Sequence, residues 1–195
     1  MHLFIDTTEK ITFGLLSEDF KWLEYFFDPK IVISTKLHSL IQKMLDKNGI
    51  DFSQLDSLVY IAGPGSYTGM RVAEGIAQIV EWQNKSVFSF YHYEVPKICG
   101  VETGAWIASA FKGEMFLHEW DQKLEENKLL LTNDLENMVD GKNLFSLRGD
   151  LELKTTSTAQ MIELNSQVIF NYVFKNKMKR KLYYYRPLEQ EFSKC

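Results

Sequence analysis

Residues 61–71, with the sequence Ile-Ala-Gly-Pro-Gly-Ser-Tyr-Thr-Gly-Met-Arg, constrain the fold of this chain more than any other stretch. They follow an apolar run at residues 58–61 that predicts a buried strand, and they lead into residues 68–83, whose apolar spacing predicts a helix. Three glycines and a proline within seven residues make a tight turn between the two, and we call residues 63–69 the elbow. A strand that turns at once into a helix is typical of α/β folds.

The elbow has two interpretations. A glycine-rich turn at a helix N-terminus presents backbone N–H groups and a partial positive charge, so Gly63, Gly65, Ser66 and Thr68 form a candidate anion-binding loop. Alternatively, the elbow is purely structural and lets the helix lie close to the sheet, with Ser66 and Thr68 placed to cap it. Geometry alone favours the structural interpretation, since the sequence contains neither the P-loop pattern nor the G-x-G-x-x-G fingerprint.

The remaining patterns predict two α/β lobes, at residues 1–92 and 93–195. The first lobe is expected to contain three antiparallel strands, a helix, a strand, the elbow helix and a last strand, at residues 2–5, 11–16, 20–27, 34–48, 58–61, 68–83 and 86–90. The second, smaller lobe is expected to contain short helices at 94–100 and 133–139, strands at 105–111, 114–120, 128–131 and 144–147, a last helix at 160–174 and an extended tail at 182–187.

The helix predicted at residues 34–48 has a wide apolar face. Its apolar residues recur at the i, i+3, i+4, i+7 and i+8 positions of one helical face: Leu37, Leu40, Ile41, Met44 and Leu45. We expect Ile41 and Leu45 to face the sheet, and Leu37, Leu40 and Met44 to face outwards.

The elbow helix carries a row of small residues, Gly69, Ala73 and Ala77, at four-residue steps. Small residues allow another backbone to approach closely, and Val72, Ile76 and Val80 belong to an adjacent apolar stripe. Two such helices could meet a similar pair from a partner in a four-helix bundle. The alternative is that both helices only cover the sheet of their own chain.

Composition narrows the functional class. The chain has 195 residues, 45% apolar and 25% charged, with a net charge of −4, which argues against a surface that binds nucleic acid throughout. A basic run at residues 175–181 is expected to be a solvated helix end. Two cysteines without a C-x-x-C pair, and no signal-peptide or membrane-spanning pattern, favour a cytoplasmic protein.

No catalytic or metal constellation is expected. The four histidines, at positions 2, 38, 92 and 118, share no ligand spacing, and Ser66 has no identifiable partner base. Asp6-Thr7-Thr8 could bind Mg²⁺ and phosphate as in actin-like ATPases. Those proteins usually carry a glycine after the aspartate, however, and its absence here favours a simple turn.

Four segments together resemble one protein family. Residues 6–8 resemble its D-T-S/T opening, and residues 63–71 resemble its G-P-G-S-F-T-G-L-R signature. Residues 105–120, with Lys112-Gly113-Glu114 at the turn, are similar to its A-x-x-A-x-(R/K)-G-E-x-(Y/F) hairpin, and Tyr184-Tyr185-Arg186 is similar to its Y-L-R element. The family is TsaB, also called YeaZ, an accessory family for threonylcarbamoyladenosine tRNA modification.

The resemblance implies an actin-like (ASKHA, RNase H-like) fold in which helices flank mixed sheets. It implies a non-catalytic subunit without metal or resident cofactor, which binds the catalytic subunit TsaD partly through the two first-lobe helices and is joined by the ATPase TsaE. The complex modifies adenosine 37 of tRNA, so tRNA is expected to contact this chain only indirectly, and nucleotide to bind weakly, if at all, at the joint interface.

On this basis we assign the following residues to partner binding: Leu37, Leu40, Met44, Gly69, Val72, Ala73 and Ile76. A homodimer through the same helices remains open. The alternative from another functional class is a small ATPase or phosphotransferase of the same fold, using Asp6 and the Gly63–Gly69 loop.

Overall fold

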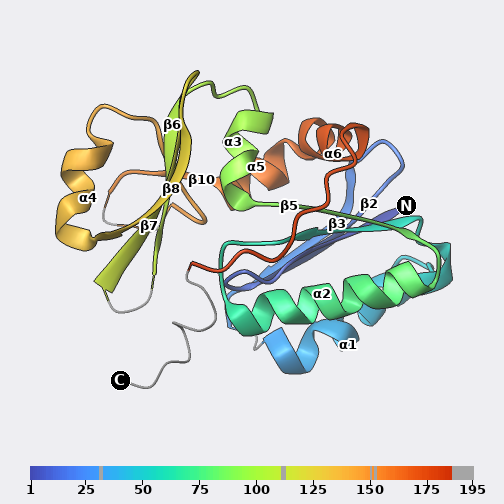
Figure 1. The fold of residues 1–195 in the computed structure, drawn as a ribbon. Coiled ribbons are helices and arrows are strands. Elements are labelled where there is room, and N and C mark those ends of the chain that lie inside the picture. Colours follow the sequence, from blue (N-terminus) through green and yellow to red (C-terminus); the bar gives the residue numbers. More distant parts are fainter. Residues whose placement is uncertain (31–32, 111–112, 150, 152, 186–195) are drawn as a thin grey trace. The chain divides into compact units, whose positions relative to one another are not determined.

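The computed structural model describes residues 1–30, 33–110, 113–149, 151 and 153–185 (Figure 1). The chain divides into two compact units, each with its own five-stranded sheet. Unit 1 comprises Met1–Tyr91 and Phe170–Cys195, and unit 2 comprises His92–Ile169. The first boundary lies beside the expected one, whereas the return of the chain to unit 1 at Phe170 differs from the expected 93–195 lobe.

The sheet of unit 1 has the strand order β3-β2-β1-β4-β5. Its strands are β1 (His2–Asp6), β2 (Ile11–Leu16), β3 (Trp22–Asp28), β4 (Ser57–Ile61) and β5 (Ser86–Phe90). The antiparallel pairing of β1, β2 and β3 confirms the predicted meander, and β1, β4 and β5 run parallel. β3 begins two residues later than predicted, because Phe20 adopts a φ of 59° in the turn before it.

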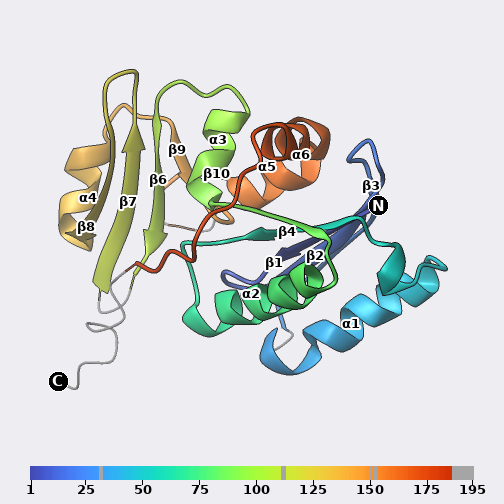
Figure 2. The same cartoon turned by 45° about the vertical axis from the view of Figure 1, so that its right-hand side comes forward.

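Helices cover both faces of this sheet. Helices α1 (Ile33–Lys47) and α2 (Tyr67–Trp82) lie together on one face, with the short 3-10 helix η1 (Phe52–Gln54) between α1 and β4 (Figures 1 and 2). Phe170 and Phe174 of α6 (Ser166–Lys175) pack on the other face, where both contact Phe20. Since successive strand residues point to opposite faces, all five residues of β1 and of β4 are buried.

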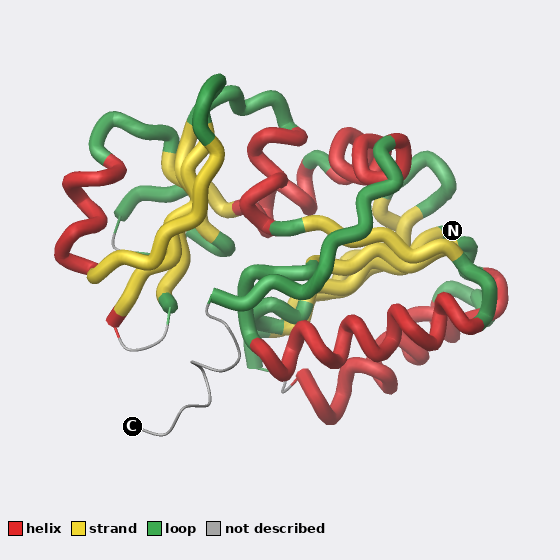
Figure 3. Tube along the Cα trace, viewed as in Figure 1, coloured by secondary structure: helices red, strands yellow, loops and turns green. Residues whose placement is uncertain are grey.

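The segment after α6 runs beside β5 in unit 1, and Figure 3 shows it as a loop next to the strands. The Ser89 N–H donates to the carbonyl of Met178 (3.0 Å), and the Arg180 N–H donates to Ser89 Oγ (2.6 Å). Farther along, the Tyr183 N–H donates to the carbonyl of Ala62 (2.9 Å). These bonds tie the segment to unit 1. Residues 186 and 187 of the predicted extended tail lie outside the described residues.

Unit 2 contains a second mixed sheet with the order β10-β9-β6-β7-β8. Its elements are η2 (His92–Glu94), α3 (Val95–Ile98), β6 (Gly104–Ser109), β7 (Glu114–Trp120), β8 (Glu125–Leu131), α4 (Thr132–Val139), β9 (Leu144–Ser146), β10 (Thr156–Ser157) and α5 (Thr158–Leu164). The predicted hairpin is present as the antiparallel pair β6–β7, although residues 111 and 112 lie outside the described part. The helix predicted at 160–174 is instead two helices, because α5 ends at Leu164, with Asn165 as its C-cap, and α6 begins at Ser166.

Within the described residues, no helix is long and apolar enough to cross a membrane. The same residues contain no group of three or more His, Cys, Asp or Glu side chains that could hold a metal ion.

Candidate functional site

The apolar face of α1 is turned inwards almost completely. Leu37 is 2% exposed and Met44 is 4% exposed, and both belong to the same core cluster as Ile41 and Leu45. The expectation that Leu37 and Met44 face outwards is therefore wrong. The sheet beneath is apolar across several strands, and the whole apolar arc of α1 is used to cover it. Leu40 alone stays half-buried, at the edge of this core.

The row of small residues on α2 also faces the chain's own core. Ala73 and Ala77 are buried in the cluster beneath α1 and α2, and Gly69 is buried as well. Small side chains let α2 lie close to β4. The row of small residues, which we expected to contact the backbone of a partner, therefore contacts the sheet of unit 1 instead. Gly69 and Ala73, assigned to partner binding from the sequence, are therefore not accessible in the isolated chain.

A different face of α2 carries accessible apolar residues. Val72 and Ile76 are half-buried against the core, whereas Ile79 is 49% exposed and Trp82 is 80% exposed. Together with Gly75 these residues fall within one third of the helix circumference at 100° per residue, and we call them the α2 stripe. Val72 and Ile76 were expected at the partner surface from the sequence, whereas Ile79 and Trp82 were not. The i, i+4, i+7 spacing of residues 72, 76 and 79 was the available signal.

The surroundings of the stripe are polar. In the part of α1 whose side chains are described, residues 36–47, the exposed residues are polar or charged. Arg71 and Glu74 of α2, which lie outside the stripe, form an ion pair at 2.8 Å. An apolar stripe with polar borders is typical of a surface that binds another polypeptide.

The elbow is held by its neighbours in unit 1. Ser66 caps α2, since its Oγ accepts a hydrogen bond from the Gly69 N–H (3.3 Å). The Ser66 N–H donates to the carbonyl of Thr8 (2.6 Å), and Thr7 Oγ1 donates to the carbonyl of Gly69 (2.7 Å). Thr68 lies within the first turn of α2 and is not its cap.

Both loop glycines of the elbow are required by close packing. A Cβ on Gly65 would lie 2.4 Å from the carbonyl oxygen of Thr8, and a Cβ on Gly63 would lie 2.4 Å from the carbonyl oxygen of Tyr183. Gly63 also has a φ of +123°, which favours glycine. The glycines thus have a structural reason that does not involve an anion.

Asp6 takes part in the same packing. Its carboxylate, in a residue that is 2% exposed, accepts hydrogen bonds from the Thr8 N–H (2.9 Å) and from Thr8 Oγ1 (2.6 Å). Asp6 thereby orients Thr8, which in turn accepts the Ser66 N–H. This is the simple turn that was expected because no glycine follows Asp6, and it fixes the elbow to the end of β1.

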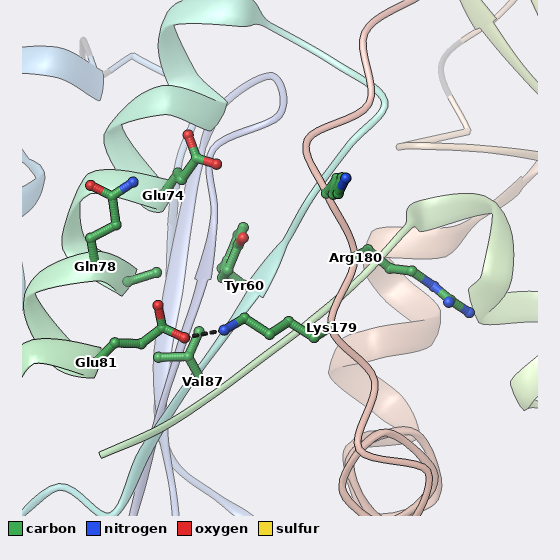
Figure 4. A pocket seen from close by; sticks show the side chains of 9 residues that line it. Tyr60, Glu74, Gln78, Glu81, Val87, Lys179 and Arg180 are labelled. Atoms are coloured by element: carbon green, nitrogen blue, oxygen red, sulfur yellow. Dashed lines mark hydrogen bonds and ion pairs between the residues drawn. The ribbon is translucent and has the colours of Figure 1, made fainter. Parts of the chain in front are cut away.

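A pocket of about 320 Å³ lies beside α2 in unit 1 (Figure 4). Glu74, Gln78 and Glu81 line it from α2, and Glu81 forms an ion pair with Lys179 across it. Tyr60 lies at its floor, and burial raises the pKa of this phenol, so the group is neutral near pH 7. The lining includes neither Asp6 nor an elbow residue, so the pocket gives no support to a nucleotide site at the expected loop.

Comparisons with known proteins connect this chain to tRNA threonylcarbamoyladenosine modification. The model of the TsaD family, tRNA N6-adenosine threonylcarbamoyltransferase, matches residues 33–90, which contain α1, β4, α2 and β5. A curated relative, the tRNA threonylcarbamoyladenosine biosynthesis protein TsaB of Haemophilus influenzae, is 46% identical over 39 residues, which are 20% of this chain and 16% of that protein. The resemblance to the TsaB/YeaZ family is confirmed.

Solved structures extend the likeness to both units. YeaZ from Pseudomonas aeruginosa aligns with a TM-score of 0.62 and 15% identity over 93% of this chain and 96% of its own. A second Pseudomonas aeruginosa structure, of a protein described as similar to peptidase YEAZ, gives a TM-score of 0.59 and 17% identity over 93% and 99%. Together with the two mixed sheets, these likenesses confirm the expected actin-like fold.

Proposed function

We propose that this chain is a non-catalytic subunit of a tRNA threonylcarbamoyladenosine complex. In this proposal it acts in the cytoplasm, binds a TsaD-like catalytic subunit, and is joined by a TsaE-like ATPase. The complex threonylcarbamoylates adenosine 37 of tRNA, which contacts this subunit only indirectly. The match to a TsaB protein and the YeaZ-like fold support the role.

One observation carries the partner assignment. The accessible apolar stripe lies on α2, within the segment that the TsaD family model matches. A TsaD-like partner would therefore contain a related pair of helices, and two related surfaces can pair about an approximate twofold axis. Of the residues first assigned to the partner surface, Leu40, Val72 and Ile76 stay partly accessible, and Ile79 and Trp82 join them.

The direct test is reconstitution. The chain is mixed with the TsaD-like subunit of the same organism, and the mass of the complex is measured by size-exclusion chromatography with light scattering. We expect a heteromeric complex, and we expect modified tRNA, detected by mass spectrometry of nucleosides, to depend on this chain. A well-folded sample that forms no complex, with modification proceeding in its absence, would overturn the proposal.

Calorimetry with ATP and Mg²⁺ distinguishes the ATPase alternative from the proposal of a non-catalytic subunit. Because the Asp6 carboxylate accepts two hydrogen bonds from Thr8, and the Thr8 carbonyl accepts one from Ser66 of the elbow, we expect this chain alone to bind no nucleotide at micromolar affinity. Micromolar binding that is lost in Asp6→Ala would favour the enzyme.

A further inference from the structure

Gly75 lies in the middle of α2, and nothing in unit 1 explains why it is glycine. It is not among the residues with positive φ, so an alanine would fit its backbone. A Cβ built at this position meets no atom within 4 Å, so an alanine would also have room. In these respects Gly75 differs from Gly63 and Gly65, whose surroundings exclude a side chain.

A mid-helix glycine without a packing role is unfavourable to the isolated chain. Glycine loses more backbone freedom than alanine on entering a helix, and it is among the least favourable residues for a helix interior. The missing side chain leaves the backbone of α2 accessible, because the position is only partly covered.

The residues that flank Gly75 on α2 indicate what the accessible backbone at this position could bind. Val72 lies one turn before it and Ile79 one turn after it, on the same face of α2. Trp82 lies two turns after Gly75, about 10 Å along the axis, and is the most exposed of the large apolar residues described. Tryptophan is one of the residue types enriched among those that dominate binding energy at interfaces.

We infer that Gly75 is the point at which a helix of the partner crosses α2, with its backbone close to that of α2, and that Trp82 anchors the partner at the end of the stripe. This inference rests on the proposed function and names the residues that determine its partner surface. The occupant is the apolar face of a helix of the TsaD-like subunit. The family match at residues 33–90 supports this occupant, because it indicates that such a subunit contains a related helix.

The inference predicts that stability and binding respond oppositely at Gly75. Gly75→Ala and Gly75→Leu fill open space in the isolated chain and improve helix propensity, so the urea midpoint of unfolding should rise or stay unchanged. The leucine side chain occupies the crossing point, so Gly75→Leu should weaken binding to the TsaD-like subunit at least tenfold. Trp82→Ala should also weaken binding at least tenfold, without lowering the midpoint.

Matched controls separate the crossing point from general effects on the surface. Gln78→Leu places the same leucine side chain at an exposed position of α2 outside the stripe, and Leu164→Ala truncates an apolar residue of unit 2 that is 73% exposed. Both variants should bind within threefold of wild type. Affinity is measured by calorimetry, and light scattering reports self-association.

Each result decides the question. If wild type binds the TsaD-like subunit and Gly75→Leu binds equally well, the inference is wrong although the proposed function stands. A comparable loss in Gln78→Leu would also overturn it. If Gly75→Leu dissociates a homodimer without changing the affinity for the TsaD-like subunit, the occupant is a second copy of this chain and the assignment is wrong. If wild type forms no complex, both the inference and the proposed function fail.

Discussion

Leu37 and Ile79 provide a test of which helix face is accessible. From its spacing, Leu37 was expected at the partner surface, yet it is 2% exposed, whereas Ile79 is 49% exposed on α2. Truncating each residue to alanine should therefore separate stability from binding. Leu37→Ala should destabilise the fold without changing the partner surface. Ile79→Ala should alter the partner surface with little effect on stability.

The magnitudes follow from burial. Leu37→Ala removes three buried carbon groups worth about 0.8 kcal/mol each, and the cavity left behind brings the expected loss to roughly 2–5 kcal/mol. For Ile79→Ala, the half-buried side chain forfeits about 1 kcal/mol of transfer free energy. The better helix propensity of alanine offsets about 0.4 kcal/mol of that loss, which leaves a change of about 0.6 kcal/mol.

Urea unfolding followed by far-UV circular dichroism measures the first quantity, and calorimetric titration with the TsaD-like subunit measures the second. We expect Leu37→Ala to keep wild-type affinity per folded molecule, and Ile79→Ala to lose about tenfold. The reasoning is refuted if Leu37→Ala keeps its stability within about 0.5 kcal/mol and loses affinity, because Leu37 would then face the partner as the spacing first indicated.

Three further predictions concern Gly65 of the elbow, Asp6 and His118. Gly65→Ala places a methyl group against the backbone of Thr8 and should cost about 1–3 kcal/mol by urea unfolding; an unchanged midpoint would contradict the packing. Asp6→Ala leaves the buried N–H and hydroxyl of Thr8 without this acceptor and should cost about 1–3 kcal/mol, so wild-type stability would argue against its role in the turn. Burial lowers the pKa of His118 below its usual 6.5, although the hydrogen bond to Asn127 and the charge of Glu125 act in the opposite direction. The unfolded state therefore binds more protons in acid than the folded state does. Stability that is fully present above about pH 6.5 should then fall as the pH decreases, and His118→Gln should reduce this slope between pH 7.5 and 5.5; equal slopes would exclude the assignment.

Local patterns predicted most of unit 1. The meander at residues 2–28 follows from short apolar runs separated by turns, and the parallel strands follow from the helices between them. The Ser66 cap and the Asp6 turn are also local, since their partners lie within three residues in the sequence. Such features depend on neighbouring residues, which the sequence shows directly.

The features that the sequence did not predict depend on distant contacts. The apolar periodicity of residues 160–174 continues past Asn165, so it gives no sign that two helices meet there. The return to unit 1 rests on Phe170 and Phe174, which pack against Phe20 some 150 residues earlier. A helical period identifies an apolar face, but it does not identify the segment that the face will meet.

The same limit explains the error on α1 and leads to a more reliable criterion for a partner surface. Leu37 and Ile79 have similar hydrophobicity and both lie on apolar helix faces, so pattern alone does not distinguish a core residue from an accessible one. Glycine is more informative once the structure is known, because each glycine can be compared with the space around it. Gly63 and Gly65 are explained by the backbone that lies against them, and Gly75 is not. A residue that is unfavourable to the isolated chain and lies between accessible apolar residues indicates a contact outside that chain, which is why α2, rather than α1, is the helix to mutate first.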